Sequence, residues 1–211
     1  MVFKSASRII MQAKKNELEL MAGQRLMLGF DGLSFNDDVR HIIRDIKAGG
    51  IILFKNNIQS PDQLKRLIKD CKEYAKECGL PKLFIAVDQE GGTVARLRAP
   101  FTQFKGNPHI RTRDDAVHFA RITARELKSV GFNMNLAPVL DCVPDGVDSI
   151  MKDRCFKGDV QTVSRLGMCV IDTLQQEGVM AVAKHFPGIG RTVKDSHFLL
   201  PVLEADYDTL E

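Results

Sequence analysis

Short hydrophobic runs alternate along the chain with stretches in which apolar residues recur at helical spacing. The runs are mostly apolar rather than apolar at every second position, a pattern typical of strands that are buried on both faces of a parallel sheet. They cover residues 24–30, 51–54, 83–87, 133–139 and 179–183. The sequence therefore predicts five strands of one buried sheet.

The stretches between these runs predict amphipathic helices. After Asn36, a residue type that caps helices, Val39, Ile42, Ile43 and Ile46 follow with i, i+3, i+4, i+7 spacing. Further helices are expected from the Ser60-Pro61 start to Gly79, near residues 114–130 and from about 159 to 177, with a helical lead-in over the first 20 residues or so.

Strands that alternate with helices predict an α/β fold with a parallel sheet. No linker, repeat or low-complexity segment interrupts the pattern, so residues 1–211 are expected to form a single domain. An open doubly wound sheet is one option, but the turns at Gly29-Phe30-Asp31-Gly32 and Gly188-Ile189-Gly190 lack the full glycine fingerprint of its phosphate site. The other option is a (β/α)8 TIM-barrel-like fold, which needs about 250 residues. The chain would supply about five of its eight βα units and leave the barrel incomplete.

Composition narrows the class of protein. Of the 211 residues 44% are hydrophobic, which excludes a disordered chain. A net charge of +3, with two Tyr and no Trp, provides neither the field nor the stacking residues of a nucleic-acid-binding protein, so no nucleic-acid partner is expected. No apolar stretch approaches the roughly 18 residues of a membrane span, and no signal-peptide pattern opens the chain. We therefore expect no membrane partner.

The cysteines indicate a reducing compartment. There are five, an odd number, and none forms a CxxC pair: Cys71, Cys78, Cys142, Cys155 and Cys169. Neither a disulfide framework nor a zinc knuckle is expected, and the isolated His41, His109 and His118 do not suggest a metal site. The sequence predicts a cytoplasmic protein that has free thiols and carries no metal or cofactor.

Polar residues gather where the predicted strands end. They are Asp31, Lys55-Asn56-Asn57, Asp88-Gln89-Glu90-Gly91-Gly92, Asp141 and Lys184-His185. In parallel α/β folds the active site lies at the carboxyl ends of the strands, because the βα loops converge there. One such residue alone would be read as a cap or a turn, whereas five groups together predict a site at this edge.

Four segments in this order resemble glycoside hydrolase family 3, and specifically its β-N-acetylhexosaminidase branch. They are Gly49–Phe54 with Asn56-Asn57, Ala86–Gly92 with Val94 and Arg96-Leu97, Asn135–Asp141, and Lys184–Gly188 with Asp195-Ser196-His197 and Leu200-Pro201. The resemblance runs from about residue 17 to the C-terminus. It implies a (β/α)8 barrel that removes terminal β-linked N-acetylglucosamine with retention of configuration, with cell-wall recycling as the expected setting.

The resemblance also implies roles for individual residues. The acid/base would be His197, held by Asp195 two residues earlier, on a mobile loop after the fifth strand. An aspartate orders one imidazole nitrogen and leaves the other free to exchange a proton. The residues expected to bind the sugar are Asp88, Arg96, Arg154, Lys184 and His185, and they are expected to converge in one pocket.

The nucleophile implied by the resemblance is an aspartate in a Ser-Asp motif on a later strand. No such motif follows His197, since Glu204, Asp206 and Asp208 lie in a polar tail. The chain is therefore either a piece of a longer enzyme or a truncated relative, and we expect no turnover from residues 1–211 alone. A glycoside phosphorylase of the same family, or a degenerate sugar-binding module without catalysis, are the alternatives. The open edge of an incomplete barrel would favour self-association.

Overall fold

The computed structural model describes residues 14–194 and 198–203. They fall into two compact units, Met1–Val87 with Leu127–Met134 and Asp88–Glu126 with Asn135–Glu211. Residues 14–23 are helical, as expected of the lead-in. In the described part of the chain, no helix combines the length and the apolar character needed to cross a bilayer.

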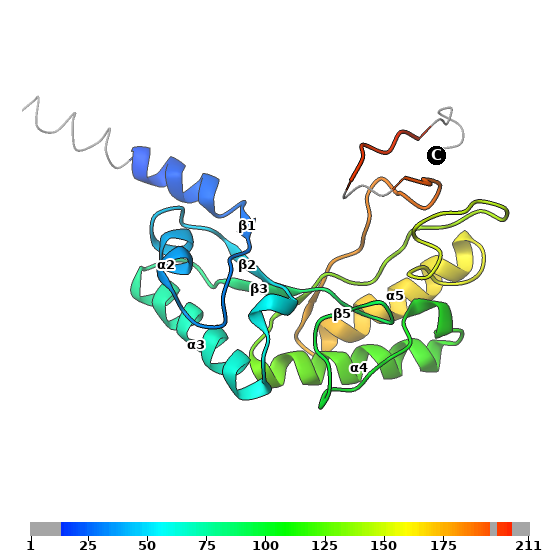
Figure 1. Ribbon diagram of the computed structural model, residues 1–211, viewed down its shortest axis with the longest axis horizontal. Coiled ribbons are helices and arrows are strands. Elements are labelled where there is room, and N and C mark those ends of the chain that lie inside the picture. The colour runs from blue at the N-terminus through cyan, green and yellow to red at the C-terminus, as the bar shows by residue number, and fades with distance from the viewer. Residues whose placement is uncertain (1–13, 195–197, 204–211) are drawn as a thin grey trace, which may run out of the picture. The chain divides into compact units, whose positions relative to one another are not determined.

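The first unit is built on three parallel strands (Figure 1). They are β1 (Met27–Leu28), β2 (Gly50–Leu53) and β3 (Phe84–Val87). Gly50 pairs with Met27 of β1 and with Phe84 of β3, and the β2–β3 pairing continues to Leu53 opposite Val87. Helix α2 (Asp37–Arg44) connects β1 to β2, and a 3-10 turn η1 (Lys55–Asn57) and helix α3 (Pro61–Glu77) connect β2 to β3.

Both helix starts that the sequence predicts in this unit are confirmed. The Asn36 side chain accepts a hydrogen bond from the backbone N–H of Val39, and Ser60 accepts one from Gln63. Helix α2 ends at Arg44, before Ile46, because Lys47 adopts a φ of 60° and breaks the helical geometry. The apolar stripes form a buried core that includes Val39, Ile43, Ile51, Leu53, Leu64, Ile68 and Ile85.

The remaining elements complete the expected alternation. They are β4 (Gln89–Gly91), β5 (Val94–Ala95), the 3-10 turn η2 (Asn107–His109), α4 (Arg113–Val130), β6 (Met134–Asn135), α5 (Val160–Gln176) and β7 (Met180–Ala181). The antiparallel β4–β5 pair was not predicted, because its residues are mostly polar and too few to show a strand period. Asp159 caps α5 by accepting a hydrogen bond from Thr162.

The strand order of the main sheet is β1-β2-β3-β6-β7, and helices α2, α3, α4 and α5 follow its first four strands. This confirms the predicted α/β fold with five strands in chain order. Strand β6 covers only the start of the hydrophobic run 133–139. Pairing resumes at Val139, which bridges Lys184 in parallel.

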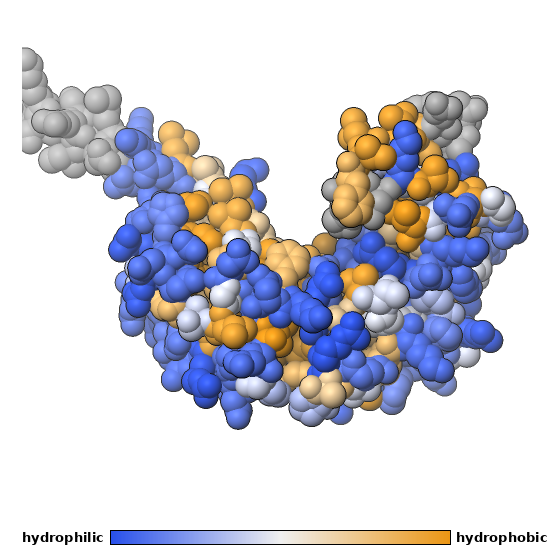
Figure 2. Space-filling view, viewed as in Figure 1, coloured by the Kyte–Doolittle hydropathy of each residue, from blue (hydrophilic) through white to orange (hydrophobic). Residues whose placement is uncertain are grey.

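The second unit has its own core and one exposed apolar segment. Buried residues include Phe119, Ala120, Ala137, Val139, Leu166 and Val170. Gly167 of α5 lets the helix lie against Leu140, because a Cβ there would come within 2.3 Å of a Leu140 methyl carbon. After β7, large apolar side chains stand exposed (Figure 2): Phe186, Val193, Phe198, Leu199, Leu200 and Val202.

Candidate active site

Lys184 joins two carboxylates in the second unit. Its Nζ lies 2.7 Å from Oδ1 of Asp88 and 2.6 Å from Oε1 of Glu90. Asp88 directly follows β3 and Glu90 lies in β4, so the short hairpin aims both carboxylates at one ammonium group. Lys184 is held by its backbone as well, which donates to Pro138 O and accepts from Leu140 N. These contacts fix a lysine beside two acids at the ends of the strands.

Arg154 binds the other side of Glu90. Its Nε and NH2 donate to the two oxygens of the Glu90 carboxylate at 3.0 and 2.8 Å, a bidentate pair. Burial alone would lower the pKa of Arg154, but the hydrogen bonds and charge of Glu90, with the charges of Asp88 and Asp141, raise it above its ordinary value. The Glu90 side chain is only 3% exposed, so it is a buried anion between two cations.

Arg96 completes the cluster from the end of the hairpin. Its NH2 donates to Oδ2 of Asp88 at 3.3 Å. The Gln89 side chain accepts from the backbone of Arg96 and of Leu97, which holds the hairpin closed, and the buried Asn135 exchanges two hydrogen bonds with the Gln89 backbone. The Nε of Arg96 is buried and has no hydrogen-bond partner among the described residues.

His185 is held by Asp141. Oδ2 of Asp141 accepts from Nδ1 of His185 at 2.6 Å and from its backbone N–H at 3.1 Å, and Oδ1 accepts from the backbone N–H of Ile189 at 2.6 Å. Burial would raise the pKa of Asp141, but the hydrogen bond from His185, with that from Ile189 and the charge of His185, holds it below its ordinary value. Because its side chain is fully buried and both oxygens are engaged, Asp141 is poorly placed to act as a nucleophile.

The loop that leads to Asp195 and His197 is anchored at its root. Ile189 packs against the buried cluster of Val139, Met151 and Cys155, and its carbonyl accepts from both the backbone and the hydroxyl of Thr192. These contacts hold the loop up to Thr192, and they do not test the mobility expected farther along. Asp195 and His197 themselves lie outside the described residues.

Most of the residues predicted to bind sugar thus lie together. Asp88, Arg96, Arg154 and Lys184 are joined by ion pairs through Glu90 and Asp88, and His185 is the neighbour of Lys184 in the chain. Glu90 and Asp141 were missed as site residues. Glu90 stands inside the strand-end motif and Asp141 closes another, so a carboxylate following an apolar run was the available signal.

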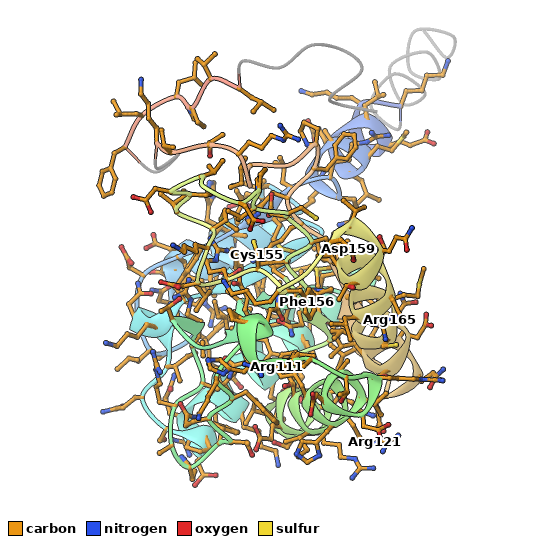
Figure 3. The ribbon with its side chains drawn as sticks, turned by 90° about the vertical axis from the view of Figure 1, so that its right-hand side faces the viewer. Arg111, Arg121, Cys155, Phe156, Asp159 and Arg165 are labelled. Atoms are coloured by element: carbon orange, nitrogen blue, oxygen red, sulfur yellow. The ribbon has the colours of Figure 1, made fainter. Side chains whose placement is uncertain are left out.

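A cavity of about 850 Å³ lies beside the segments that carry these residues, and it is lined by neither Asp88 nor Lys184. Its walls are the loop from Cys142 to Asp148 and the segment from Cys155 to Val160, with Lys152 and Arg191. Figure 3 labels Cys155, Phe156 and Asp159 on this wall, where the chain enters α5. The expected convergence in one pocket is therefore seen as an ion-paired cluster, and the pocket found here has a different lining.

In the first unit, polar side chains at the ends of the strands bind neighbouring loops. Asn57 is fully buried and donates to the carbonyls of Phe30 and Gly32, and Asn56 donates to the Asp31 carboxylate at 2.6 Å. These contacts give Asn57 a structural role. Across the described residues, no cluster of three or more His, Cys, Asp or Glu side chains is arranged to hold a metal ion.

Comparison with known proteins identifies similar chains. A model described as "Glycosyl hydrolase family 3 N terminal domain" matches residues 10–211. The chain is 36% identical over 187 residues to a β-hexosaminidase of Thioalkalivibrio sulfidiphilus and 38% identical over 183 residues to one of Methylobacillus flagellatus. These matches cover 84% and 82% of this chain and 52% and 51% of the relatives, so the chain spans about half the length of the curated relatives it matches.

Solved structures agree with this match. A family 3 β-N-acetylglucosaminidase from Paenibacillus sp. FPU-7 superposes with a TM-score of 0.86 at 36% identity, over 92% of this chain and 37% of that one. NagZ from Neisseria gonorrhoeae, in complex with N-trifluoroacetyl-D-glucosamine, superposes with a TM-score of 0.79 at 30% identity, over 88% and 56%. The likeness covers both sequence and fold, and the chain belongs to glycoside hydrolase family 3, whose N-terminal domain it matches over residues 10–211.

Proposed function

We propose that the protein is a retaining glycosidase that removes terminal β-linked N-acetylglucosamine, and that residues 1–211 belong to a single domain, the N-terminal barrel domain of family 3. The observation that carries the proposal is the cluster of Asp88, Glu90, Arg154 and Lys184, which follow β3, β6 and β7 in the chain. Charged donors and acceptors that are held rigidly make strong, directional hydrogen bonds to sugar hydroxyls. The similar β-hexosaminidases and the N-acylglucosamine bound to the gonococcal relative support the same sugar.

In this proposal each residue has a stated task. Asp88 accepts from sugar hydroxyls, while Lys184, Arg154 and Arg96 donate. His197, oriented by Asp195, protonates the leaving oxygen and later takes a proton from water. A carboxylate must attack the anomeric carbon in a retaining enzyme. Asp141 is unsuited to that step, since both of its oxygens accept hydrogen bonds within the fold.

Binding of N-acetylglucosamine to the 211-residue chain, measured by calorimetry, tests the sugar site. Asp88→Ala should weaken binding by about 1.5–3 kcal/mol, the range for hydrogen bonds to charged groups. Asp172→Ala, which removes an exposed aspartate of α5, is the matched control and should bind like the wild type. No binding by the wild type, or equal affinities of wild type and Asp88→Ala, would contradict the proposal.

The acid/base assignment needs a turnover assay on an active preparation. His197→Ala should cost about 10²–10⁴ in rate on a natural disaccharide, and less on an aryl N-acetylglucosaminide whose leaving group needs no proton. An equal loss on both substrates would reject His197 as the proton donor. Product analysis with and without phosphate separates hydrolysis from phosphorolysis. We expect the 211-residue chain to bind the sugar without turnover.

The cellular setting is part of the proposal. We place the protein in the cytoplasm, in the recycling of cell-wall fragments, and its five free cysteines are consistent with a reducing compartment. We also propose self-association, since β7 is an outer strand of the sheet and the segment after it exposes Phe186, Phe198 and Leu200. Sedimentation of the purified chain tests this, and a monomer at all concentrations would contradict it.

A further inference from the structure

The Asp141 carboxylate is inaccessible to a ligand. Its carboxylate is fully buried, and its two oxygens accept from Nδ1 and the backbone N–H of His185 and from the backbone N–H of Ile189. Asp141 lies just after the hydrophobic run 133–139 that contains β6, and His185 lies after β7. A carboxylate placed in this way acts on the site only through the imidazole that it binds.

The charge state of Asp141 determines where the imidazole carries its proton. The pKa of this carboxyl is held below its ordinary value in spite of burial, so near neutral pH the group is an anion that can only accept. The short contact to Nδ1 of His185 then requires a proton on Nδ1. In the neutral ring the lone pair is left on Nε2, which makes this nitrogen an acceptor.

Nε2 of His185 is available to a ligand. Within the described part of the chain it has no hydrogen-bond partner, and the side chain is 29% exposed. The preceding residue, Lys184, presents its ammonium group to Asp88 and Glu90. A sugar that reaches Lys184 therefore meets a neighbouring nitrogen that can accept a hydrogen bond from a hydroxyl.

We propose that Asp141 is a positioning residue that holds His185 with its proton on Nδ1, so that Nε2 accepts a hydrogen bond from one hydroxyl group of the bound sugar. This inference rests on the proposed sugar site and adds a requirement to it. The ligand must carry a hydrogen-bond donor at that position. A fluorine, which is similar in size to a hydroxyl, cannot donate, so analogues with fluorine at that position should bind more weakly.

The tautomer can be read directly in the 211-residue chain labelled with ¹⁵N-histidine. At a pH where imidazoles are neutral, two-bond ¹H–¹⁵N correlation spectra distinguish a protonated Nδ1 from a protonated Nε2, and His185→Asn assigns the signal by its loss. We expect His185 to carry its proton on Nδ1. A proton on Nε2 in the wild type would overturn the inference without any need for a variant of Asp141.

Two variants separate positioning from folding. Asp141→Asn can also donate to Nδ1, so it should shift His185 toward the form protonated on Nε2 and weaken N-acetylglucosamine binding about three- to tenfold. Asp172→Asn, with the same change of charge on the exposed face of α5, should leave both unchanged. An unaltered tautomer in a folded Asp141→Asn variant would refute the role of Asp141.

A separate measurement tests the proposed hydrogen bond between Nε2 of His185 and the sugar. N-acetylglucosamine analogues with fluorine in place of one hydroxyl at a time are titrated against the wild type and His185→Asn, in which the amide can still donate to Asp141 but no group replaces Nε2. One analogue should lose about three- to tenfold in affinity with the wild type and little with the variant. Equal losses in both proteins would overturn the hydroxyl contact. Absence of any sugar binding would overturn the proposed function and this contact, while the Nδ1 tautomer would still establish the positioning.

Discussion

Neutralising Glu90 should be one of the most damaging single changes in the second unit. Its side chain is 3% exposed and is held by three short contacts, 2.6 Å to Lys184 and 2.8 and 3.0 Å to Arg154. Removing one partner of a buried ion pair costs about 3–5 kcal/mol, because the remaining charge is left uncompensated. Glu90→Gln keeps the shape and one acceptor, so we expect the lower end, about 3 kcal/mol. For a chain of this size that corresponds to a fall in Tm of about 6–12 °C.

Chemical denaturation of the purified chain measures this loss. Glu73→Gln removes the same charge from an exposed site, where the carboxylate is 60% exposed and lies 3.8 Å from Lys69, and should cost less than about 0.5 kcal/mol. Adding Arg154→Met to Glu90→Gln should recover part of the loss, since one stranded cation is removed. If Glu90→Gln stays within about 1 kcal/mol of the Glu73 control, the buried network does not carry the stability that its geometry implies.

Three further outcomes are expected. Asn57→Ala should cost about 2–3 kcal/mol in denaturation experiments, because it strands buried backbone groups that the amide binds, and a loss below 0.5 kcal/mol would contradict this. The pKa of Asp141 is lowered in the folded protein, so the stability that its carboxylate adds is present above the unfolded pKa of 3.8 and is lost as pH falls through the folded pKa. The pH profile of stability for Asp141→Asn should lack this loss at acid pH. An identical loss in the wild type and the variant would contradict the prediction. Burial raises the pKa of Cys71 and of Cys155 to about 12, so iodoacetamide at pH 8 should leave both unmodified in the folded chain, as mass spectrometry can verify; alkylation of either at the rate of the unfolded protein would contradict it.

Features set by local chemistry were predictable from the sequence. The caps at Asn36 and Ser60 and the strand run at 84–87 depend on neighbours within a few residues, and the structure has them where the pattern places them. Asp88 and Lys184 are 96 residues apart in the chain, yet their presence at the same edge of the sheet was predictable as well. Parallel strands bring their carboxyl ends to the same edge, so a polar residue that follows one apolar run is a candidate partner for another.

The choice of partners within the site was not predictable in the same way. An apolar run indicates that the residues after it lie near the edge of the sheet, but it does not indicate which carboxylate pairs with which cation. Glu90 became the centre of the network because β4 turns back after Asp88, and that hairpin is too short to show a period. Asp141 binds His185 across 44 residues through a contact that depends on how far the two strands run past Pro138. Such pairings follow from register and side-chain length in three dimensions.

The charges of the cluster bear on the kind of ligand it suits. Lys184, Arg154 and Arg96 each contact a carboxylate, and because these three cations share the two carboxylates of Asp88 and Glu90, most of their charge is paired within the fold. A neutral sugar cannot compensate a buried charge, and a protein that binds one with charged side chains must pair those charges within its own fold. The ammonium group of Lys184 has three N–H groups and contacts two carboxylates, so one N–H remains able to bind a hydroxyl. The ion pairs of the cluster are therefore compatible with the uncharged sugar of the proposed function.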